Sequence, residues 1–499
     1  MTDKQAIKHI VIVGGGTAGW ISAATLARAF GRSLSITLVE SEQIGTVGVG
    51  EATIPQIRLL NHYLGLDENE FLRETQATFK LGIRFDGWTR PRHSYIHAFG
   101  EIGRGLDILP FHHYWLRARA EGLQRSLWEF SINAEAANNN AFSRMEPGQG
   151  PIPSGINYAF HFDASLYAAF LRKYAEQRGV KRIEGKVSDI QLDGENGHVR
   201  QLQLEDGQLV PGQLFIDCSG FRGLLIEHAL KTGYEDWTHW LPCDRAAAVP
   251  CKRTEPLQPF TRAVARKAGW QWRIPLQHRT GNGHVYCSRF ISDDEAVATL
   301  LDNLDGEASG EPRLLRFTTG HRKRFFNRNV LAIGLAAGFM EPLESTSIHL
   351  IQSGISRLVT LFPDSDFDPA LIDEYNRQTQ FEFERIRDFL ILHYHANGRV
   401  GEPFWEERLA MEIPASLQQR MHLFRIGGHI VREAGELFTE QSWLQLLIGQ
   451  GIDAHGFHPA SHRISANELA EFMRQGRRVI KRTAMQLPGH DEYLRKQLG

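Results

Sequence analysis

The chain has 499 residues, of which 42% are hydrophobic, and its 56 basic and 58 acidic residues give a net charge of -2. This length allows roughly two to four domain-sized units, and the balanced charge argues against a nucleic-acid partner. The four cysteines lack CxxC or metal-ligand spacing, so they predict reduced thiols and no metal site. No signal-peptide pattern follows Met1, and the most apolar stretch, at residues 331–340, is too short to span a bilayer. We therefore expect a cytoplasmic protein without a membrane segment.

A strand, a glycine-rich turn, a helix and a second strand are predicted at the start of the chain. The β-branched run at residues 9–13 is typical of a buried parallel strand, and the alanine- and leucine-rich residues 18–30 favour a helix. A second apolar run at residues 35–39 ends at Glu40. Between the first strand and the helix lies Gly14-Gly15-Gly16-Thr17-Ala18-Gly19, which fits G-x-G-x-x-G in the setting that indicates a dinucleotide site.

Each glycine of this turn has a separate physical role. Gly14 permits a tight turn, Gly16 lets the backbone approach a pyrophosphate, and Gly19 allows close packing of helix on strand. The helix N-terminus adds free N–H groups, and Glu40, 21 positions after Gly19, is placed to bind ribose hydroxyls. The alternative is a glycine-rich turn without a ligand. The predicted cofactor-binding residues here are Gly14, Gly16, Thr17, Ala18, Gly19 and Glu40.

The rest of the chain predicts an α/β protein that becomes mainly helical. Residues 79–85 alternate apolar and polar side chains, which predicts one strand with a single apolar face. Turn residues at 194–197 predict a hairpin within residues 185–203. The other predicted elements are a helix at 166–176, short buried strands at 214–217 and 330–334, and helices from Ser347 onward, with long amphipathic ones at 371–395 and 466–485.

A single nucleotide site favours FAD over a chain that also binds NAD(P)H through a second fold. The only other glycine pattern, at residues 449–454, precedes His455-Gly456-Phe457-His458-Pro459, which is not a helix start. Reducing equivalents are therefore expected from elsewhere. Flavin hydroxylases that bind NADPH without a second fold remain an alternative.

Several motifs together resemble the flavin-dependent tryptophan halogenase family. They are the glycine fingerprint, the segment at residues 48–55, Thr78-Phe79-Lys80, Gly269-Trp270-x-Trp272-x-Ile274-Pro275, and residues 339–346, and they occur in the family order. The resemblance implies a Rossmann-like FAD-binding core of the GR2 flavoprotein type with a mainly helical substrate-binding region. We expect residues 1–345 to form the FAD-binding module, with substrate-domain segments interleaved, and residues 346–499 to form the helical region.

The resemblance also implies the reaction. Reduced FAD, supplied by a separate NAD(P)H-dependent flavin reductase, meets O₂ and forms a peroxyflavin, and halide then gives hypohalous acid. This oxidant travels to a separate pocket, where Lys80 and Glu344 govern halogenation of an aromatic ring. A lysine can hydrogen-bond the oxidant or form a haloamine, and a carboxylate can take the ring proton. The alternatives are a solvated strand-face lysine and a surface or helix-capping glutamate.

Further positions follow from the same resemblance. Thr346 and Ser347 match the residues that flank the halide, bromide or chloride, although the family usually has glycine at position 347, which puts the halide geometry in question. Gly334-Leu335-Ala336-Ala337 is a further departure, because many flavoproteins place an acidic or amide residue after that glycine. The remaining residues implied are Gly50, Ala52 and Gly334 for the cofactor, His97 and Phe99 for the substrate, and Trp270, Trp272 and Pro275 as family markers near the flavin without a bond-making role.

The largest departure concerns the grip on the substrate. Tryptophan halogenases carry a lid with a tyrosine pair and a glutamate for the amino acid's charged groups, whereas residues 438–447 have no tyrosine pair. Burying a zwitterion without such partners is costly. Indole, an indole derivative or a larger aromatic is therefore expected in place of free tryptophan, with Trp443 as a pocket residue or an ordinary core tryptophan. A flavin-dependent hydroxylase and a non-catalytic flavin-binding protein are the alternatives, and a homodimer is compatible with the sequence.

Overall fold

The computed structural model describes residues 6–44, 50–148 and 150–499, which form two compact, interleaved units. Unit 1 comprises Met1–Ala77, Phe162–Asp244 and Arg316–Phe383, and unit 2 comprises Thr78–His161, Arg245–Leu315 and Glu384–Gly499. The chain thus passes repeatedly between the units, and unit 1 continues to Phe383. The division into an FAD-binding module at residues 1–345 and a helical region at residues 346–499 stays a prediction.

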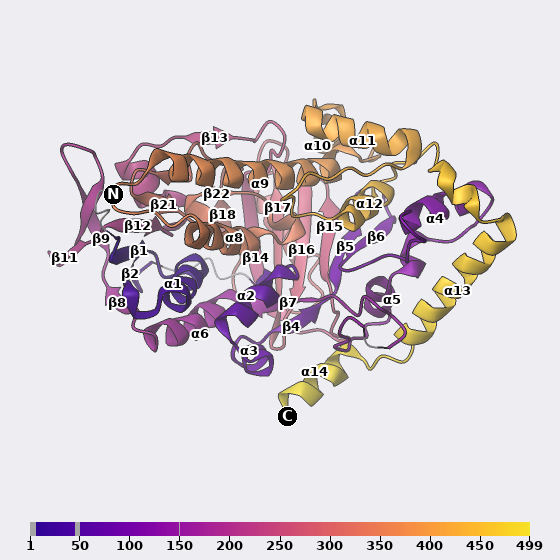
Figure 1. The fold of residues 1–499 in the computed structure, drawn as a ribbon, viewed down its shortest axis with the longest axis horizontal. Helices are drawn as coiled ribbons and strands as arrows, with labels where there is room; N and C mark the ends of the chain where they lie inside the picture. Colours follow the sequence, from indigo (N-terminus) through magenta and orange to yellow (C-terminus); the bar gives the residue numbers. More distant parts are fainter. Residues whose placement is uncertain (1–5, 45–49, 149) are drawn as a thin grey trace. The chain divides into compact units, whose positions relative to one another are not determined.

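The sheet of unit 1 has six strands in the order β20-β21-β12-β1-β2-β8. All its pairs are parallel except that of β20 with β21. Helix α1 (Thr17–Phe30) contacts α6 (Ala164–Glu176) and α8 (Ser347–Thr360), beside the sheet in Figure 1. The strands are β1 (His9–Val13), β2 (Ser35–Glu40), β8 (Lys181–Glu184), β12 (Leu214–Asp217), β20 (Phe326–Asn327) and β21 (Val330–Ala332). The predicted strand–turn–helix–strand unit is therefore confirmed, and so are the buried strands at 214–217 and near 330.

Smaller elements complete unit 1. The predicted hairpin is confirmed as β9 (Val187–Leu192) paired antiparallel with β10 (Val199–Leu204), which also pairs with β11 (Leu209–Pro211). A second three-stranded sheet has the order β13-β19-β22. Its strands are β13 (Tyr234–Asp236), β19 (Gly320–Arg322) and β22 (Gly338–Phe339), and the remaining helices are α2 (Gln56–Leu64) and α3 (Glu68–Glu74).

Unit 2 is built on a seven-stranded sheet of order β18-β14-β17-β16-β15-β5-β6. The strands are β5 (Gly82–Asp86), β6 (Ser94–Ala98), β14 (Arg245–Lys252), β15 (Thr261–Arg266), β16 (Gly269–Pro275), β17 (Arg279–Tyr286) and β18 (Arg313–Arg316). The chain from Ser347 onward is mainly helical, as predicted, and three further helices of unit 2, α4, α5 and α7, lie earlier in the sequence. These helices are α4 (Phe111–Ala120), α5 (Ile132–Asn138), α7 (Asp293–Leu301), α9 (Pro369–His395, which begins in unit 1), α10 (Pro403–Ala410), α11 (Ala415–Gly427), α12 (Glu440–Gly449), α13 (Ala466–Ala484) and α14 (His490–Leu498).

The single strand predicted at residues 79–85 is wrong. The segment forms two strands, β4 (Thr78–Lys80) and β5, which belong to different sheets. The chain changes partners at Leu81, whose N–H donates to Pro259 O and whose carbonyl accepts from Phe99 N. Gly82 permits this because an added Cβ would lie 2.4 Å from His97 O. The alternation of apolar and polar residues is real, but Lys80 on the polar side is fully buried, whereas Arg84 is partly exposed.

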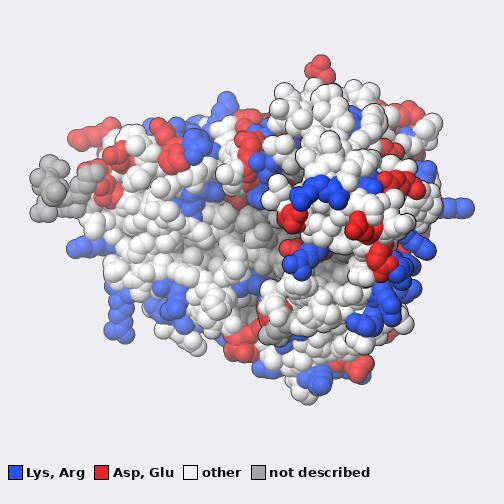
Figure 2. All heavy atoms as spheres, turned by 45° about the vertical axis from the view of Figure 1, so that its right-hand side comes forward, with Lys and Arg blue, Asp and Glu red and all other residues white. Residues whose placement is uncertain are grey.

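The surface of the described residues is mixed in charge. On the face shown in Figure 2, basic and acidic side chains are both present and lie scattered among a larger area of other residues. Within residues 6–44, 50–148 and 150–499, no helix combines the length and apolar character needed to cross a membrane.

Candidate active site

The glycine turn of unit 1 has the geometry that a dinucleotide phosphate requires. Gly14 has φ +111°, and a Cβ there would lie 2.3 Å from Cys218 O. A Cβ at Gly19 would lie 1.9 Å from Gly14 O, so helix α1 packs directly on the turn. A Cβ at Gly16, by contrast, would meet nothing within 4 Å, and Gly16 caps α1 without a side-chain hydrogen bond. Open space therefore lies at an uncapped helix N-terminus beginning with Thr17 and Ala18, which fits the phosphates of FAD.

Glu40 lies against this turn at the end of β2. A Cβ on Gly15 would come within 1.4 Å of the Glu40 Oε2 atom, so the carboxylate covers the glycine closely. The other oxygen, Oε1, accepts a hydrogen bond of 2.5 Å from Arg182 Nε. Arg182, on β8, thus fixes the Glu40 carboxylate at the edge of the turn, where it fits the predicted ribose contact. Sequence reasoning missed Arg182, because strand β8 joins β2 only in the folded sheet.

A second loop of unit 1 packs beside the same helix. Gly334 has φ +69°, and its Cβ would lie 2.8 Å from that of Ala18, so two predicted cofactor residues are neighbours. Arg322 holds the loop with two hydrogen bonds. Its side-chain Nε donates to Ala336 O at 3.1 Å, and its backbone N–H donates to Ala337 O at 2.8 Å. The Gly334 loop, which lacks the usual polar residue, is therefore held in place by Arg322. Of the predicted segment 48–55, strand β3 (Gly50–Ala52) is described, while residues 45–49 lie outside the described residues.

Glu344 and the predicted halide-binding residues follow one another in unit 1. Glu344 ends a short 3-10 helix (Pro342–Glu344) and is 1% exposed. Ser345 then adopts a left-handed conformation, φ +59°. Thr346 caps helix α8 without a side-chain hydrogen bond, and Ser347 is the first helical residue. The left-handed turn thus falls at Ser345, so position 347 carries an ordinary helical backbone that serine adopts without strain.

A buried ion-pair cluster holds the first turns of α8. His349 Nε2 lies 2.9 Å from Glu382 Oε1, and Glu382 Oε2 accepts from Ser353 at 2.8 Å and Arg357 at 2.9 Å. Burial alone raises the pKa of Glu382, but the hydrogen bond and charge of His349, followed by Arg357, lower it to about 2. The ionised carboxylate therefore fixes the helix that begins at Ser347.

Lys80 is the last residue of β4 in unit 2 and is fully buried. Strand β4 pairs antiparallel with β7 (Ala159–Asp163), with Lys80 opposite Ala159. The Lys80 Nζ atom lies 5.4 Å from the centroid of the Phe99 ring. The predicted catalytic lysine and a predicted substrate-pocket residue are therefore neighbours, and a solvated strand-face lysine is excluded.

A directed chain of hydrogen bonds supports the same strand. Thr78 Oγ1 donates to Pro275 O at 2.7 Å, so it can only accept from His161 Nδ1, 3.1 Å away. His161 Nε2 must then accept from Thr261 Oγ1 at 2.9 Å. Burial and then the nearby Lys80 lower the pKa of His161 well below its ordinary value, which keeps this imidazole neutral. Sequence reasoning missed Thr78, His161 and Thr261 as a unit, and only the fold brings them together.

The other predicted substrate residues surround the end of β6. His97 is 3% exposed, and its ring centroid lies 5.6 Å from that of Phe389 and 6.3 Å from that of Phe438. The predicted lid stretch forms α12, and its Gln445 makes two 2.9 Å hydrogen bonds with the backbone of Ala98, between His97 and Phe99. Helix α12 therefore fixes the strand that carries both residues, and sequence reasoning did not single out Gln445.

Trp443 lies deeper in the same helix. It is 1% exposed, and its indole Nε1 donates to Glu436 Oε2 at 3.3 Å. The Arg420 guanidinium lies 4.1 Å from its ring centroid and pairs with Glu436 at 2.6 Å. Its ring also meets Phe389 edge-on at 4.8 Å. Trp443 is thus a buried residue held by Glu436 and Arg420, and the Phe389 ring lies between it and His97.

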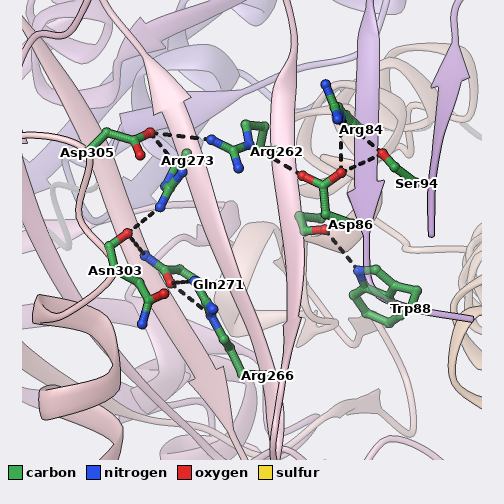
Figure 3. A network of polar contacts seen from close by, with 11 residues as sticks. Arg84, Asp86, Trp88, Ser94, Arg262, Arg266, Gln271, Arg273, Asn303 and Asp305 are labelled. Carbon is green, nitrogen blue, oxygen red and sulfur yellow. Dashed lines mark hydrogen bonds and ion pairs between the residues drawn. The ribbon is translucent and has the colours of Figure 1, made fainter. Parts of the chain in front are cut away.

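Strand β16 carries the tryptophan motif and has two different faces. Trp270 and Trp272 lie on one face with ring centroids 6.1 Å apart, and a Cβ on Gly283 would lie 2.1 Å from the Trp272 ring. The opposite face, drawn in Figure 3, carries arginines from β16, β15 and β5, linked through Gln271, Asn303 and two aspartates. The arginines are Arg84, Arg262, Arg266 and Arg273, and the aspartates are Asp86 and Asp305. The two tryptophans of the motif thus lie on one side of β16.

The structure therefore groups the predicted residues in two sets. In unit 1 the glycine turn, Glu40 and the Gly334 loop share one end of the sheet, and Glu344, Thr346 and Ser347 are consecutive. In unit 2 Lys80, Phe99 and His97 share one region, with Pro275 bonded to Thr78. Among the residues that the structure describes, no cluster of three or more His, Cys, Asp or Glu side chains could hold a metal ion.

Comparison with known proteins identifies the family. A profile described as tryptophan halogenase matches residues 9–466. Tryptophan 6-halogenase ThaL of Streptomyces albogriseolus and tryptophan 7-halogenase RebH of Lentzea aerocolonigenes are each 33% identical to this chain, over 99% of both chains. Among solved structures, Xcc4156, a flavin-dependent halogenase from Xanthomonas campestris, has a TM-score of 0.96 at 47% identity over 99% of both chains. BrvH, a flavin-dependent halogenase from Brevundimonas sp. BAL3, has a TM-score of 0.95 at 44% identity over 98% of this chain and 99% of that one. The chain belongs to the tryptophan halogenase family and is an oxidoreductase of the flavin-dependent halogenase class.

Proposed function

We propose that this enzyme uses FADH₂ and O₂ to brominate or chlorinate an electron-rich aromatic ring such as indole or an indole derivative. The observation that carries the proposal is Lys80, a fully buried lysine whose Nζ lies 5.4 Å from the Phe99 ring centroid. Burying an amine is costly unless its chemistry is used or compensated. Membership of the family supplies the reaction class in which such a lysine is expected.

Each half of the reaction has its own residues. Bound reduced flavin and O₂ supply the oxidation that turns halide into hypohalous acid. The open turn at Gly16 would hold the FAD phosphates, Glu40 would hold the ribose, and Thr346 and Ser347 would flank the halide. The helix N-terminus at Ser347 lacks a side-chain cap, and its free N–H groups suit an anion.

Lys80 and Glu344 are assigned the second half of the reaction. Lys80 would hydrogen-bond hypohalous acid, or form a haloamine with it, and present halogen to the ring. Glu344, buried in unit 1, would accept the proton that the ring loses after halogen adds. General-base assistance of this kind is worth roughly 10²- to 10⁴-fold. The buried Phe99 ring would pack against the aromatic plane of the substrate.

The substrate is expected to lack the charged groups of a free amino acid. The relatives ThaL and RebH are named as tryptophan halogenases. In this chain the corresponding lid forms α12, whose Gln445 and Trp443 are already bonded to Ala98 and Glu436. These side chains already make hydrogen bonds within unit 2. This supports a neutral indole or a larger aromatic as the substrate, because a zwitterion would need polar partners of its own.

A reconstituted assay tests the proposal. The protein is incubated with FAD, NADH, a flavin reductase, bromide and indole, and mono-brominated product is sought by mass spectrometry. The reductase is the expected partner, because the chain offers one dinucleotide turn. A hydroxylated product would favour the hydroxylase, and no product across a wide aromatic panel would favour a non-catalytic flavin protein.

Lys80 variants then test the assigned role. We expect Lys80→Met, which fills the same buried space, to lose halogenation by at least about 100-fold while FAD affinity stays unchanged. Lys80→Ala is expected to behave in the same way. Activity retained by either variant would contradict the role proposed for the lysine.

A further inference from the structure

The backbone on both sides of Lys80 is anchored to one segment of unit 2, residues 257–259. On one side, Leu81 N donates directly to Pro259 O at 2.7 Å. On the other side, Phe79 N donates to the Nε2 atom of His490 at 3.2 Å. His490 Nδ1 in turn lies 3.1 Å from Leu257 O. The first link is a direct backbone hydrogen bond, and the second passes through an imidazole ring.

The hydrogen-bond partners fix the state of His490. Leu257 O can only accept, so Nδ1 carries the proton, and Phe79 N can only donate, so Nε2 is the acceptor. This is one tautomer of the neutral ring with both nitrogens used. Burial is the largest influence on this ring and lowers the pKa of His490 to about 4, so it is neutral near neutral pH. The ring therefore connects β4 to the 257–259 segment through one hydrogen bond at each nitrogen.

Aromatic side chains surround the contact between His490 and Phe79 and bury it. The Phe79 ring stacks on Phe142 at 4.0 Å and meets Tyr493 of α14 at 5.8 Å, and His490 itself is fully buried. Helix α14 thus reaches β4 through the backbone of Phe79 as well as through its side chain. A fully desolvated hydrogen bond of this type is costly to leave unmade.

We propose that His490 is a positioning residue for Lys80. By spanning Phe79 N and Leu257 O, the neutral imidazole fixes the backbone next to the lysine, so that Nζ stays at the end of its strand beside Phe99. This inference rests on the proposed function, because it assumes that Lys80 directs the halogen to the ring. It concerns the placement of the lysine and leaves the chemistry at the flavin untouched.

Two variants separate the two hydrogen bonds of the ring. Gln in place of histidine sets an oxygen near the position of Nε2, so His490→Gln keeps an acceptor for Phe79 N. Asn sets a nitrogen near the position of Nδ1, so His490→Asn keeps a donor for Leu257 O and loses the bond to Phe79. Both variants remove the imidazole, which makes each the control for the other.

The main readout is the fate of the oxidant in the reconstituted bromination assay. A 1,3-diketone in solution traps hypobromous acid that escapes, while brominated indole reports oxidant that was captured. We expect His490→Asn to lower the ratio of product to trapped oxidant by about 10- to 100-fold, the scale of a small misplacement of a reacting group. Total oxidant formed should stay near the wild-type amount, and His490→Gln should keep a ratio near that of the wild type. An unchanged ratio in His490→Asn, or an equal fall in both variants, would overturn the proposal.

A second measurement does not depend on turnover. Amide hydrogen exchange of peptides covering residues 78–81 should be faster in His490→Asn than in His490→Gln and the wild type. Equal exchange in all three proteins would also overturn the proposal. If the wild type makes no brominated product, the proposed function fails, while the exchange data still decide whether His490 holds the strand. If His490→Asn does not fold, His490→Ala with added imidazole replaces it, and failure of imidazole to restore slow exchange counts against the role.

Discussion

His284 should make the stability of this enzyme fall on acidification. It lies on β17 with 1% exposure, opposite Gln271 and on the same face as Arg266 and Arg273. Its Nδ1 donates to Ala296 O at 3.1 Å, while Nε2 has no hydrogen-bond partner among the described residues. A proton added at Nε2 would therefore be buried, unpaired and close to arginines. Burial lowers the pKa of His284 from 6.5 to about 4, partly opposed by the bond to Ala296 and reinforced by Arg266.

The sign and size of the effect follow from this shift. Between about pH 6.5 and pH 4 the unfolded chain binds the proton that the folded chain refuses, so the free energy of unfolding rises with pH. The stabilisation is complete above about pH 6.5 and is lost as the pH falls toward 4. A shift from 6.5 to about 4 is worth about 3 kcal/mol in full, of which about 2 kcal/mol falls between pH 7 and pH 5.

The variant His284→Asn isolates this contribution. An asparagine amide placed near Nδ1 keeps the donor for Ala296 O and removes the titration. Urea unfolding of both proteins at several pH values gives the difference in the free energy of unfolding. We expect that difference to move by about 2 kcal/mol against the wild type between pH 7 and pH 5. A difference that is independent of pH would refute the reasoning.

Two glycine substitutions test the packing described above. Because a Cβ at Gly16 would meet nothing within 4 Å, Gly16→Ala should leave the unfolding temperature unchanged. The added methyl group would occupy the proposed phosphate position, so FAD binding should weaken at least about tenfold. Calorimetry measures both properties, and an unchanged FAD affinity would contradict the phosphate position. Gly283→Ala should destabilise the fold by about 1–3 kcal/mol, because its Cβ would lie 2.1 Å from the buried Trp272 ring. Urea unfolding measures that loss, and Gly194→Ala, where nothing lies within 4 Å, is the control that should lose little.

The cofactor half of the site could be predicted because its determinants are local. The turn at Gly14, Gly16 and Gly19 is specified by residues within one strand–turn–helix unit, and the space around each glycine is the space that its predicted role requires. Glu40 could be predicted to lie near this turn, because it ends the next strand. Arg182, which holds Glu40, could not be found, because it arrives on a strand 142 residues away.

The surroundings of Lys80 could not be predicted from local patterns. The periodicity of residues 79–85 predicts one strand. In the structure this strand is interrupted at Leu81, whose backbone forms long-range hydrogen bonds with Pro259 O and Phe99 N. A glycine within a strand pattern is a signal of a bend or of close backbone approach, and Gly82 provides that signal. His490 lies 411 residues from Phe79, and no feature of its own neighbourhood points to β4.

The hydrogen bond between Thr78 and Pro275 joins two parts of the sequence that otherwise seem independent. The motif that identifies the family ends in a carbonyl group that restrains a threonine two positions before the lysine. A change at the end of β16 would therefore be transmitted to the lysine's strand without any contact with substrate. The tryptophan motif therefore also helps to position Lys80, and a variant that alters Pro275 is expected to affect the placement of the lysine.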